Sequence, residues 1–211
     1  NEQLNSLMHL GNTDFLIIGG GVIGINMAIE AKRRYPDASI TLIEKEKTYA
    51  EHASGRNSGV LHAGFYYTAD SLKARFTRDG NKALTEFCNE HNIPINNCGK
   101  LVVAKNESEL EGLQELLRRG SKNGVVLHEI SAQEAREIEP RVITFEKAIF
   151  SPSTSSVDPR QVLKAMYENA LSLGIKFKTG TKYIGKTTGG IQCNTGKITA
   201  RYIILSLIHI F

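Results

Sequence analysis

Three glycines follow a short apolar run near the start of the chain. Gly19, Gly21 and Gly24 have the spacing G-x-G-x-x-G and come directly after the apolar segment 14–18. In this pattern the first glycine permits a tight turn, the second lets backbone approach a pyrophosphate, and the third lets a helix pack on a strand. Glu44 follows Gly24 at about the distance where a carboxylate accepts hydrogen bonds from ribose hydroxyls. These residues together predict dinucleotide binding.

The elements around these residues support that prediction. A strand at 14–18, a helix from the glycines to about 34 and a second strand at 39–43 form a β-α-β unit that ends on Glu44. The N-terminus of the helix offers free N–H groups and a positive dipole end to phosphate. An acid at position 44 disfavours a 2′-phosphate and therefore NADP, and leaves FAD and NAD as alternatives.

The loop that follows favours the larger cofactor. Residues 51–67, EHASGRNSGVLHAGFYY, are dense in Gly, Ser, Asn and His. Gly55 and Gly59 flank Arg56, Asn57 and Ser58. Such a loop brings N–H groups and an arginine to a phosphate or to a flavin edge. An NAD-binding unit would normally enter the next helix directly, so the loop favours FAD.

This loop also carries a family resemblance. HASGRNSGVLHAGFYY with the later SLKA at 71–74, together with the glycines and Glu44-Lys45, resembles the L-2-hydroxyglutarate dehydrogenase/oxidase family. That family belongs to the FAD-dependent, D-amino-acid-oxidase-like oxidoreductases. The resemblance covers about 14–204. It implies that FAD is the cofactor and that L-2-hydroxyglutarate, or a similar 2-hydroxy acid, is oxidised to 2-oxoglutarate by hydride transfer to the flavin.

The resemblance also implies a set of site residues. The cofactor-binding residues are expected to be Gly19, Gly21, Gly24, Glu44, Lys45, Ser54, Arg56, Asn57, Ser58, Gly59 and Val60. The expected catalytic residues are His62, Tyr66 and Arg56, and no metal site is expected. His62 lies inside the specific motif and its imidazole titrates in the useful range, so it is predicted to be the base or a substrate ligand. The alternative is that it only positions the loop.

Several of these roles have competing interpretations. Tyr66 and Tyr67 either line the substrate pocket or fill core space. Arg56 and Lys73 are candidates for a cationic clamp on a dicarboxylate, although Arg56 has an alternative role at the cofactor. His52 is a weaker catalytic candidate than His62.

The predicted fold class is α/β, a Rossmann-like FAD-binding domain with an inserted, sheet-based substrate domain that is incomplete. Residues 1–95 are expected to begin the FAD-binding domain, 96–157 to form part of the substrate domain, and 158–204 to return to the first domain. The further helices are expected at 70–91, 107–119, after a capping box at 131–134, and 158–174. The further strands are expected at 97–104, 125–130, 148–151, 175–177, 182–184, 190–193 and 198–204.

The last residues look foreign to the protein. The apolar run at 198–204 continues without a turn residue into 205–211, and LSLIHI matches the translation of a transposase-type sequencing adapter. Residues 205–211 are therefore predicted to be a sequencing or read-through scar, the alternative being an ordinary C-terminal strand. Because the family's chains are longer, the 211-residue product is expected to be inactive alone.

Composition narrows the remaining possibilities. With 26 Lys and Arg against 22 Asp and Glu, the net charge is +4 and no basic run is present, so no nucleic-acid partner is expected. The apolar stretches are too short for a transmembrane segment, and three scattered cysteines indicate a reducing compartment. The expected location is cytoplasmic, either free or peripheral to the inner membrane.

Two other function classes remain open. An amine, amino-acid or glycerol-3-phosphate oxidoreductase of the same fold is one, and a non-catalytic nucleotide-binding module is the other. The expected partners are a small 2-hydroxy acid and an electron acceptor, which is oxygen, a quinone or a carrier protein.

Overall fold

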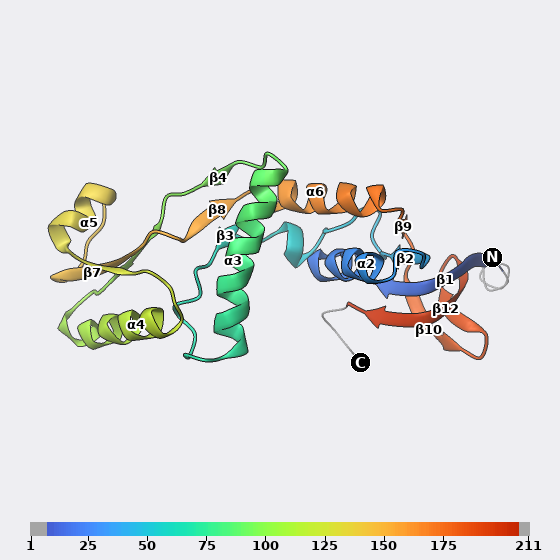
Figure 1. Cartoon of the computed structure of the whole chain (residues 1–211), viewed down its shortest axis with the longest axis horizontal. Coiled ribbons are helices and arrows are strands. Elements are labelled where there is room, and N and C mark those ends of the chain that lie inside the picture. The colour runs from blue at the N-terminus through green and yellow to red at the C-terminus, as the bar shows by residue number, and fades with distance from the viewer. Residues whose placement is uncertain (1–7, 207–211) are drawn as a thin grey trace. The chain divides into compact units, whose positions relative to one another are not determined.

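The chain divides into two compact units. The computed structural model describes residues 8–206 (Figure 1). The first unit comprises Asn1–Asn57 and Pro159–Phe211, and the second comprises Ser58–Asp158. The chain therefore leaves the first unit once, completes the second, and returns.

The first unit is built on a six-stranded sheet. Its strands are β1 (His9–Ile18), β2 (Ile40–Ile43), β9 (Lys176–Lys178), β10 (Tyr183–Thr187), β11 (Gly190–Cys193) and β12 (Gly196–Leu205). Their order is β10-β11-β12-β1-β2-β9. β1 runs parallel to both β12 and β2, and β2 runs parallel to β9, whereas β10 and β11 pair antiparallel at one edge. The predicted α/β class with a parallel sheet is confirmed.

Two helices pack in this unit, α2 (Val22–Arg34) and α6 (Pro159–Ser172). The small Ala28 and the larger Ile25 of α2 are fully buried, as a helix that packs closely on a sheet requires. The last turn of α2 carries three basic residues, Lys32, Arg33 and Arg34, which favour the negative end of the helix dipole. This packing fixes the N-terminus of α2 at the end of β1.

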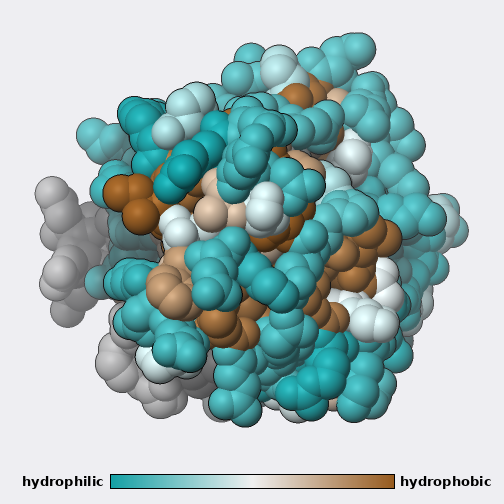
Figure 2. All heavy atoms as spheres, turned by 90° about the vertical axis from the view of Figure 1, so that its left-hand side faces the viewer, coloured by the Kyte–Doolittle hydropathy of each residue, from teal (hydrophilic) through white to brown (hydrophobic). Residues whose placement is uncertain are grey.

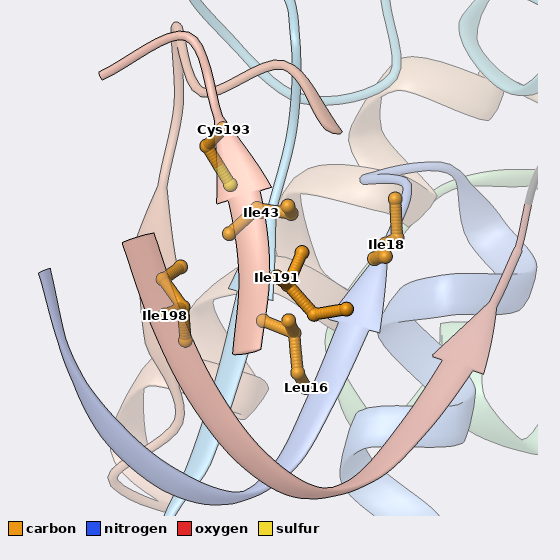
Figure 3. Close-up of a cluster of buried hydrophobic side chains, with 6 residues drawn as sticks. All are labelled: Leu16, Ile18, Ile43, Ile191, Cys193 and Ile198. Atoms are coloured by element: carbon orange, nitrogen blue, oxygen red, sulfur yellow. The ribbon is translucent and has the colours of Figure 1, made fainter. Parts of the chain in front are cut away.

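An apolar cluster forms a second part of the core (Figure 3). Leu16 and Ile18 of β1 and Ile43 of β2 pack with Ile191 and Cys193 of β11 and with Ile198 of β12. All six are at most 3% exposed. The β10–β11 hairpin therefore contributes to the core of the parallel sheet.

The second unit contains two antiparallel sheets. One has the order β3-β8-β4 and the other β5-β7-β6. The strands are β3 (Val60–Leu61), β4 (Ile95–Asn96), β5 (Lys100–Val103), β6 (His128–Ser131), β7 (Lys147–Ser151) and β8 (Ser155–Val157). The helices are α3 (Leu72–Glu90), α4 (Leu110–Lys122) and α5 (Ala132–Ile138), with short 3₁₀ turns at η1 (Ala53–Gly55) in the first unit and η2 (Glu107–Glu109) here.

Helix α4 is strongly amphipathic. Leu113 is buried against Ala104 and Ile149, whereas most of the charged residues of α4 are exposed, with Glu115 and Arg119 half-buried. The surface of the second unit around α4 and α5 is accordingly mostly hydrophilic, with separate apolar patches (Figure 2). The predicted solvated face of this helix is confirmed.

Some predicted boundaries differ from the structure. The capping box at 131–134 is present, since the Ser131 hydroxyl accepts from the Glu134 N–H and the Glu134 carboxylate accepts from the Ser131 N–H. The strand predicted at 125–130 begins only at His128, because Val125 follows a left-handed Gly124 and packs into the core instead. The two-residue strands β3 and β4 were not predicted.

The position of residues 58–95 is the largest difference. These residues were expected in the first domain, yet they cluster with the second unit because β3 and β4 both pair with β8. Their functional assignment to the FAD-binding domain stays a prediction. Leu205 lies in β12 opposite Ile18, and of the predicted scar 205–211, residues 207–211 lie outside the described part of the chain.

The three cysteines are all free, and two of them are buried. Burial raises the pKa of the Cys88 and Cys193 thiols, whereas Cys98 is exposed. Because the thiolate is the reactive form, we expect one fast-reacting thiol with Ellman's reagent at about pH 8 in the native chain. The Cys98→Ser variant should lose this fast phase and Cys88→Ser should keep it. Two fast-reacting thiols in the native chain would contradict this prediction.

Candidate cofactor and active-site residues

The turn that joins β1 to α2 consists of three glycines at 19–21, so it carries no side chains. Gly19 has a φ of +118°, a conformation that favours glycine. A Cβ on Gly24 would lie 1.9 Å from the Gly19 carbonyl oxygen, so only glycine permits this contact of the helix with the turn. Gly19 thus permits the tight turn, and Gly24 permits the close contact between the helix and the turn.

Glu44 follows β2 and supports the turn directly. Its Oε2 accepts a hydrogen bond from the Gly20 N–H at 2.7 Å, and its Oε1 accepts one from the Glu46 N–H at 3.0 Å. The side chain is buried, with 9% exposed. The backbone of Glu44 bonds to Lys178 and Thr181, which ties it to the segment after β9. The predicted ribose-binding acid therefore lies beside the glycine-rich turn.

The loop after Glu44 returns to the same turn. The Ser54 hydroxyl accepts from the Val22 N–H at 3.1 Å, in the first turn of α2. A Cβ on Gly21 would lie 3.0 Å from this hydroxyl. The loop is held partly by Tyr49, whose ring stacks on Tyr167 of α6 with centroids 4.0 Å apart. Ser54 thus lies at the N-terminus of α2, and its predicted binding of the cofactor stays a prediction.

The other predicted residues of this loop form their contacts within the loop itself. Arg56 is exposed and pairs with Glu51 at 3.6 Å, and Lys45 pairs with Glu46 at 3.5 Å. Asn57 donates from its side chain to the Ser54 carbonyl at 2.8 Å, which closes the 3₁₀ turn η1. The direct contacts of Arg56 and Lys45 are thus ion pairs with acids of their own loop.

The turn and its neighbours have the features that a dinucleotide requires. The N–H groups of Gly19, Gly20 and Val22 are bonded within the protein, which leaves those of Gly21 and Ile23 at the positive dipole end of α2. A buried carboxylate, that of Glu44, lies next to the turn. A carboxylate has about four lone-pair sites, and Glu44 uses two of them within the protein. The residues present therefore fit an FAD or NAD group.

Removal of the Glu44 carboxylate tests its structural role. Glu44→Ala would leave the Gly20 and Glu46 N–H groups without their acceptor, and we expect the free energy of unfolding to fall by about 2–3 kcal/mol. Glu46→Ala is the matched control, because its exposed carboxylate pairs only at the surface and is expected to cost less than about 1 kcal/mol. Urea unfolding of the two variants measures both values. Equal losses would contradict the prediction.

The second half of the specific motif belongs to the second unit. Ser58 begins that unit, Gly59 has a φ of +68°, and Val60 starts β3 opposite Ser156. Phe65 is 1% exposed and packs with Val125. The predicted site residues are therefore divided between the two units.

His62 and Tyr66 are both exposed and lie on either side of the buried residues 63–65 in the sequence. Burial, and after it the positive charge of Lys100, lowers the pKa of His62. Lys100 Nζ lies 4.6 Å from the centroid of the Tyr66 ring. Lys100, which the sequence did not single out, thus contacts Tyr66 and acts on His62 through its charge.

Helix α4 holds this segment in place. Arg119 donates to the Tyr66 carbonyl at 3.1 Å, and the Asn123 side chain donates to the carbonyls of Gly64 and Tyr67 at 3.2 and 3.0 Å. Neither residue was predicted to have a role at the site. A charged helix end offers no local signal of such contacts, because their acceptors are backbone groups far away in the sequence.

Residues 14–207 match the family described as FAD dependent oxidoreductase. The chain belongs to this family, and the predictions of the fold and of FAD as the cofactor are confirmed. Among the described residues, no group of His, Cys, Asp and Glu is arranged to hold a metal ion. No helix within 8–206 is both long and apolar enough to cross a membrane.

The similar relatives are named L-2-hydroxyglutarate dehydrogenase, which confirms the resemblance seen in the loop motif. The Escherichia coli K12 protein is 47% identical over 153 residues, which are 72% of this chain and 36% of that protein. The mitochondrial protein of Nematostella vectensis is 42% identical over 168 residues, which are 79% of this chain and 35% of that protein. The matched part of the chain thus spans about a third of these curated relatives.

Solved structures share the fold. L-alpha-glycerophosphate oxidase from Mycoplasma pneumoniae, solved with FAD bound, has a TM-score of 0.79 at 27% identity and covers 91% of this chain and 53% of its own. L-proline dehydrogenase from P. horikoshii has a TM-score of 0.82 at 21% identity, and the match covers 93% of this chain and 53% of that chain.

Proposed function

We propose that the full-length protein oxidises the C2 alcohol of L-2-hydroxyglutarate, or of a similar 2-hydroxy acid, to the 2-oxo acid with FAD as cofactor. The identity of 47% to a relative named L-2-hydroxyglutarate dehydrogenase carries this proposal. The specific sequence motif at 51–67, which contains His62 and Tyr66, supports it. Relatives of this name in bacteria and in animals support it further.

The cofactor residues we propose are those of the turn and the loop. The N–H groups of Gly21 and Ile23 would bind the pyrophosphate, and the free lone pairs of Glu44 would accept from ribose hydroxyls. Gly19, whose own N–H donates to the Ile43 carbonyl at 2.9 Å, would let the pyrophosphate approach the backbone. Gly24 would support the turn rather than touch the cofactor. Lys45, Ser54, Arg56, Asn57, Ser58, Gly59 and Val60 complete the proposed set.

The chemistry requires one proton and one hydride to leave the alcohol. When bound, FAD supplies the acceptor for the hydride. The His62 imidazole would take the hydroxyl proton, which a neutral ring nitrogen can do. Among the described residues, no hydrogen-bond or ion-pair partner occupies the His62 ring. Tyr66 and Arg56 stay proposed contributors to binding of the substrate.

A second candidate is oxidation of glycerol phosphate. The solved structure named L-alpha-glycerophosphate oxidase is 27% identical over most of this chain, which keeps this substrate class under consideration. An amine or amino-acid substrate is the further alternative within the fold. The higher identity to L-2-hydroxyglutarate dehydrogenases favours the 2-hydroxy acid.

Anaerobic spectroscopy separates these candidates. The visible spectrum of the full-length protein is recorded before and after addition of L-2-hydroxyglutarate, its D-enantiomer, glycerol phosphate or an amino acid. We expect an oxidised flavin spectrum that bleaches with L-2-hydroxyglutarate and not with the D-form. Bleaching with another substrate would reject the 2-hydroxy acid, and a spectrum without flavin would reject the cofactor assignment.

The electron acceptor is proposed to be oxygen, a quinone or a carrier protein, and the location to be cytoplasmic or peripheral to the inner membrane. Reoxidation of the substrate-bleached protein by oxygen, by a soluble quinone analogue or by neither ranks the three acceptors. Sedimentation with membrane vesicles tests peripheral attachment directly.

A further inference from the structure

Lys100 is a partly buried cation without an acidic partner. It is the first residue of β5, where its backbone lies opposite Ser151 of β7. Within residues 8–206, no carboxylate lies within ion-pair distance of its ammonium group, whereas Lys147 on β7 pairs with Glu129 at 2.8 Å. A half-buried cation that is left unpaired is able to bind an anion from outside the protein.

Its neighbours are two of the predicted catalytic side chains. The ammonium lies 4.6 Å from the centroid of the Tyr66 ring, which is within the range of a cation–π contact. Its charge also reaches His62, whose pKa it lowers in addition to the effect of burial. The Lys100 ammonium therefore contacts the Tyr66 ring and is near enough to the His62 imidazole for its charge to act there.

This group is held in position by the second unit alone. The ring of Tyr66 packs on the buried Phe65 at 4.3 Å, and Arg119 fixes the Tyr66 carbonyl at 3.1 Å. The backbone of Lys100 is fixed by the β5–β7 pairing. These supports fix the backbone of Lys100 and the ring of Tyr66 against which its ammonium lies, which lowers the cost of ordering the pair for a ligand.

We propose that Lys100 is the binding point for a carboxylate of the substrate, next to His62. The identity of that substrate rests on the function proposed above, while the carboxylate subsite itself rests on the side chains of the second unit. A lysine suits this role because it presents a compact charge with rotatable donors. Contact of the Lys100 stem with Tyr66 for packing alone is the competing explanation.

The first test needs no turnover. The ring C–H signals of the six histidines are followed by NMR in the 211-residue chain, and His62 is assigned from the His62→Gln variant. The chain is then titrated with 2-oxoglutarate as the carboxylate probe. We expect the His62 signal to shift in the wild type and in Lys105→Met, an exposed lysine just beyond β5, and to stay unmoved in Lys100→Met.

The second test uses the full-length enzyme with L-2-hydroxyglutarate. Loss of a charged hydrogen bond predicts that Lys100→Met raises KM by about 10- to 100-fold, with a smaller change in kcat. Lys100→Arg keeps the charge and should retain KM within about tenfold, and Lys105→Met should match the wild type. Lys100→Gln replaces Lys100→Met if the latter fails to fold, as judged from its circular dichroism.

The outcomes separate this proposal from the proposed function. An equal His62 shift in the wild type and in Lys100→Met, or an unchanged KM in a folded variant, overturns the carboxylate subsite. Loss of the shift in Lys100→Met, in a protein that fails to oxidise L-2-hydroxyglutarate, would support the subsite and reject the substrate. No shift with 2-oxoglutarate in the wild-type chain overturns the subsite whatever the full-length protein oxidises.

Discussion

Replacement of His62 by glutamine is expected to lower kcat of the full-length protein by about 10²–10⁴-fold, which is the usual contribution of a general base. Glutamine keeps the polarity and approximate length of the side chain, but it accepts no proton at neutral pH. The flavin content should remain unchanged, because His62 belongs to the second unit and the glycine-rich turn to the first. Steady-state kinetics with L-2-hydroxyglutarate measures the effect.

The matched control is His128→Gln. His128 is exposed on β6, in the same unit, and has no predicted role, so its variant should retain wild-type kcat. A His62→Gln protein that keeps more than about a tenth of kcat would show that His62 only positions the loop, since loss of a base costs more than this.

The pH dependence of kcat/KM is a second test of His62 as the base. A base acts when it is unprotonated, so kcat/KM should rise with pH through the pKa of His62 and then level off. Burial and the charge of Lys100 lower this pKa, which places the rise below the ordinary histidine value of about 6.5. Removal of the Lys100 charge should move the rise to higher pH. A rise centred above about pH 7 in the wild type would exclude His62 as its origin.

Gly24→Ala is expected to destabilise the first unit by about 3 kcal/mol and to abolish flavin binding by the full-length protein. The new methyl group would lie 1.9 Å from the Gly19 carbonyl oxygen, so α2 or the turn must move. The clash is with backbone, which cannot rotate away as a flexible side chain does. The loss far exceeds the gain in helix propensity of about 1 kcal/mol that alanine offers over glycine.

Gly112 provides the matched control for this prediction. It is the third residue of α4, as Gly24 is of α2, and a Cβ there would meet no atom within 4 Å. Gly112→Ala should therefore leave the chain as stable as the wild type or more stable by up to about 1 kcal/mol. The urea unfolding midpoints of both variants are compared with that of the wild type. Changes in stability of the same sign in both variants would contradict the proposed role of Gly24.

Most of the first unit was predictable because its signals are local. An apolar run, three glycines, a helix with a basic last turn and a second apolar run identify β1, α2 and β2 by themselves. Strands such as β3 and β4 were not predictable, since two residues are too few to show alternation. Their pairing with β8 is also why residues 58–95 cluster with the second unit instead of the first.

The candidate site was predictable only where the motif is continuous. Glu44 and Ser54 were selected from the sequence, and the structure bonds them to the N–H groups of Gly20 and Val22, next to the predicted glycines. Lys100 was missed because a lysine at the start of a strand resembles any solvated lysine until the fold brings it over Tyr66. Direct binding of FAD or substrate by any of these residues stays a prediction.

The pairing of β1 with β12 has a consequence for the order of folding. These parallel strands lie at opposite ends of the described chain, so the central contact of the sheet has a very high sequence separation, and such contacts form late. The second unit can fold first, and the hydrogen bond of 2.9 Å between the Val157 N–H and the Gly59 carbonyl brings its two ends together. Each halving of the effective loop length saves about 0.6 kcal/mol of closure entropy. Folding of the inserted unit therefore shortens the effective loop between β1 and β12 and lowers the entropy cost of pairing these two strands.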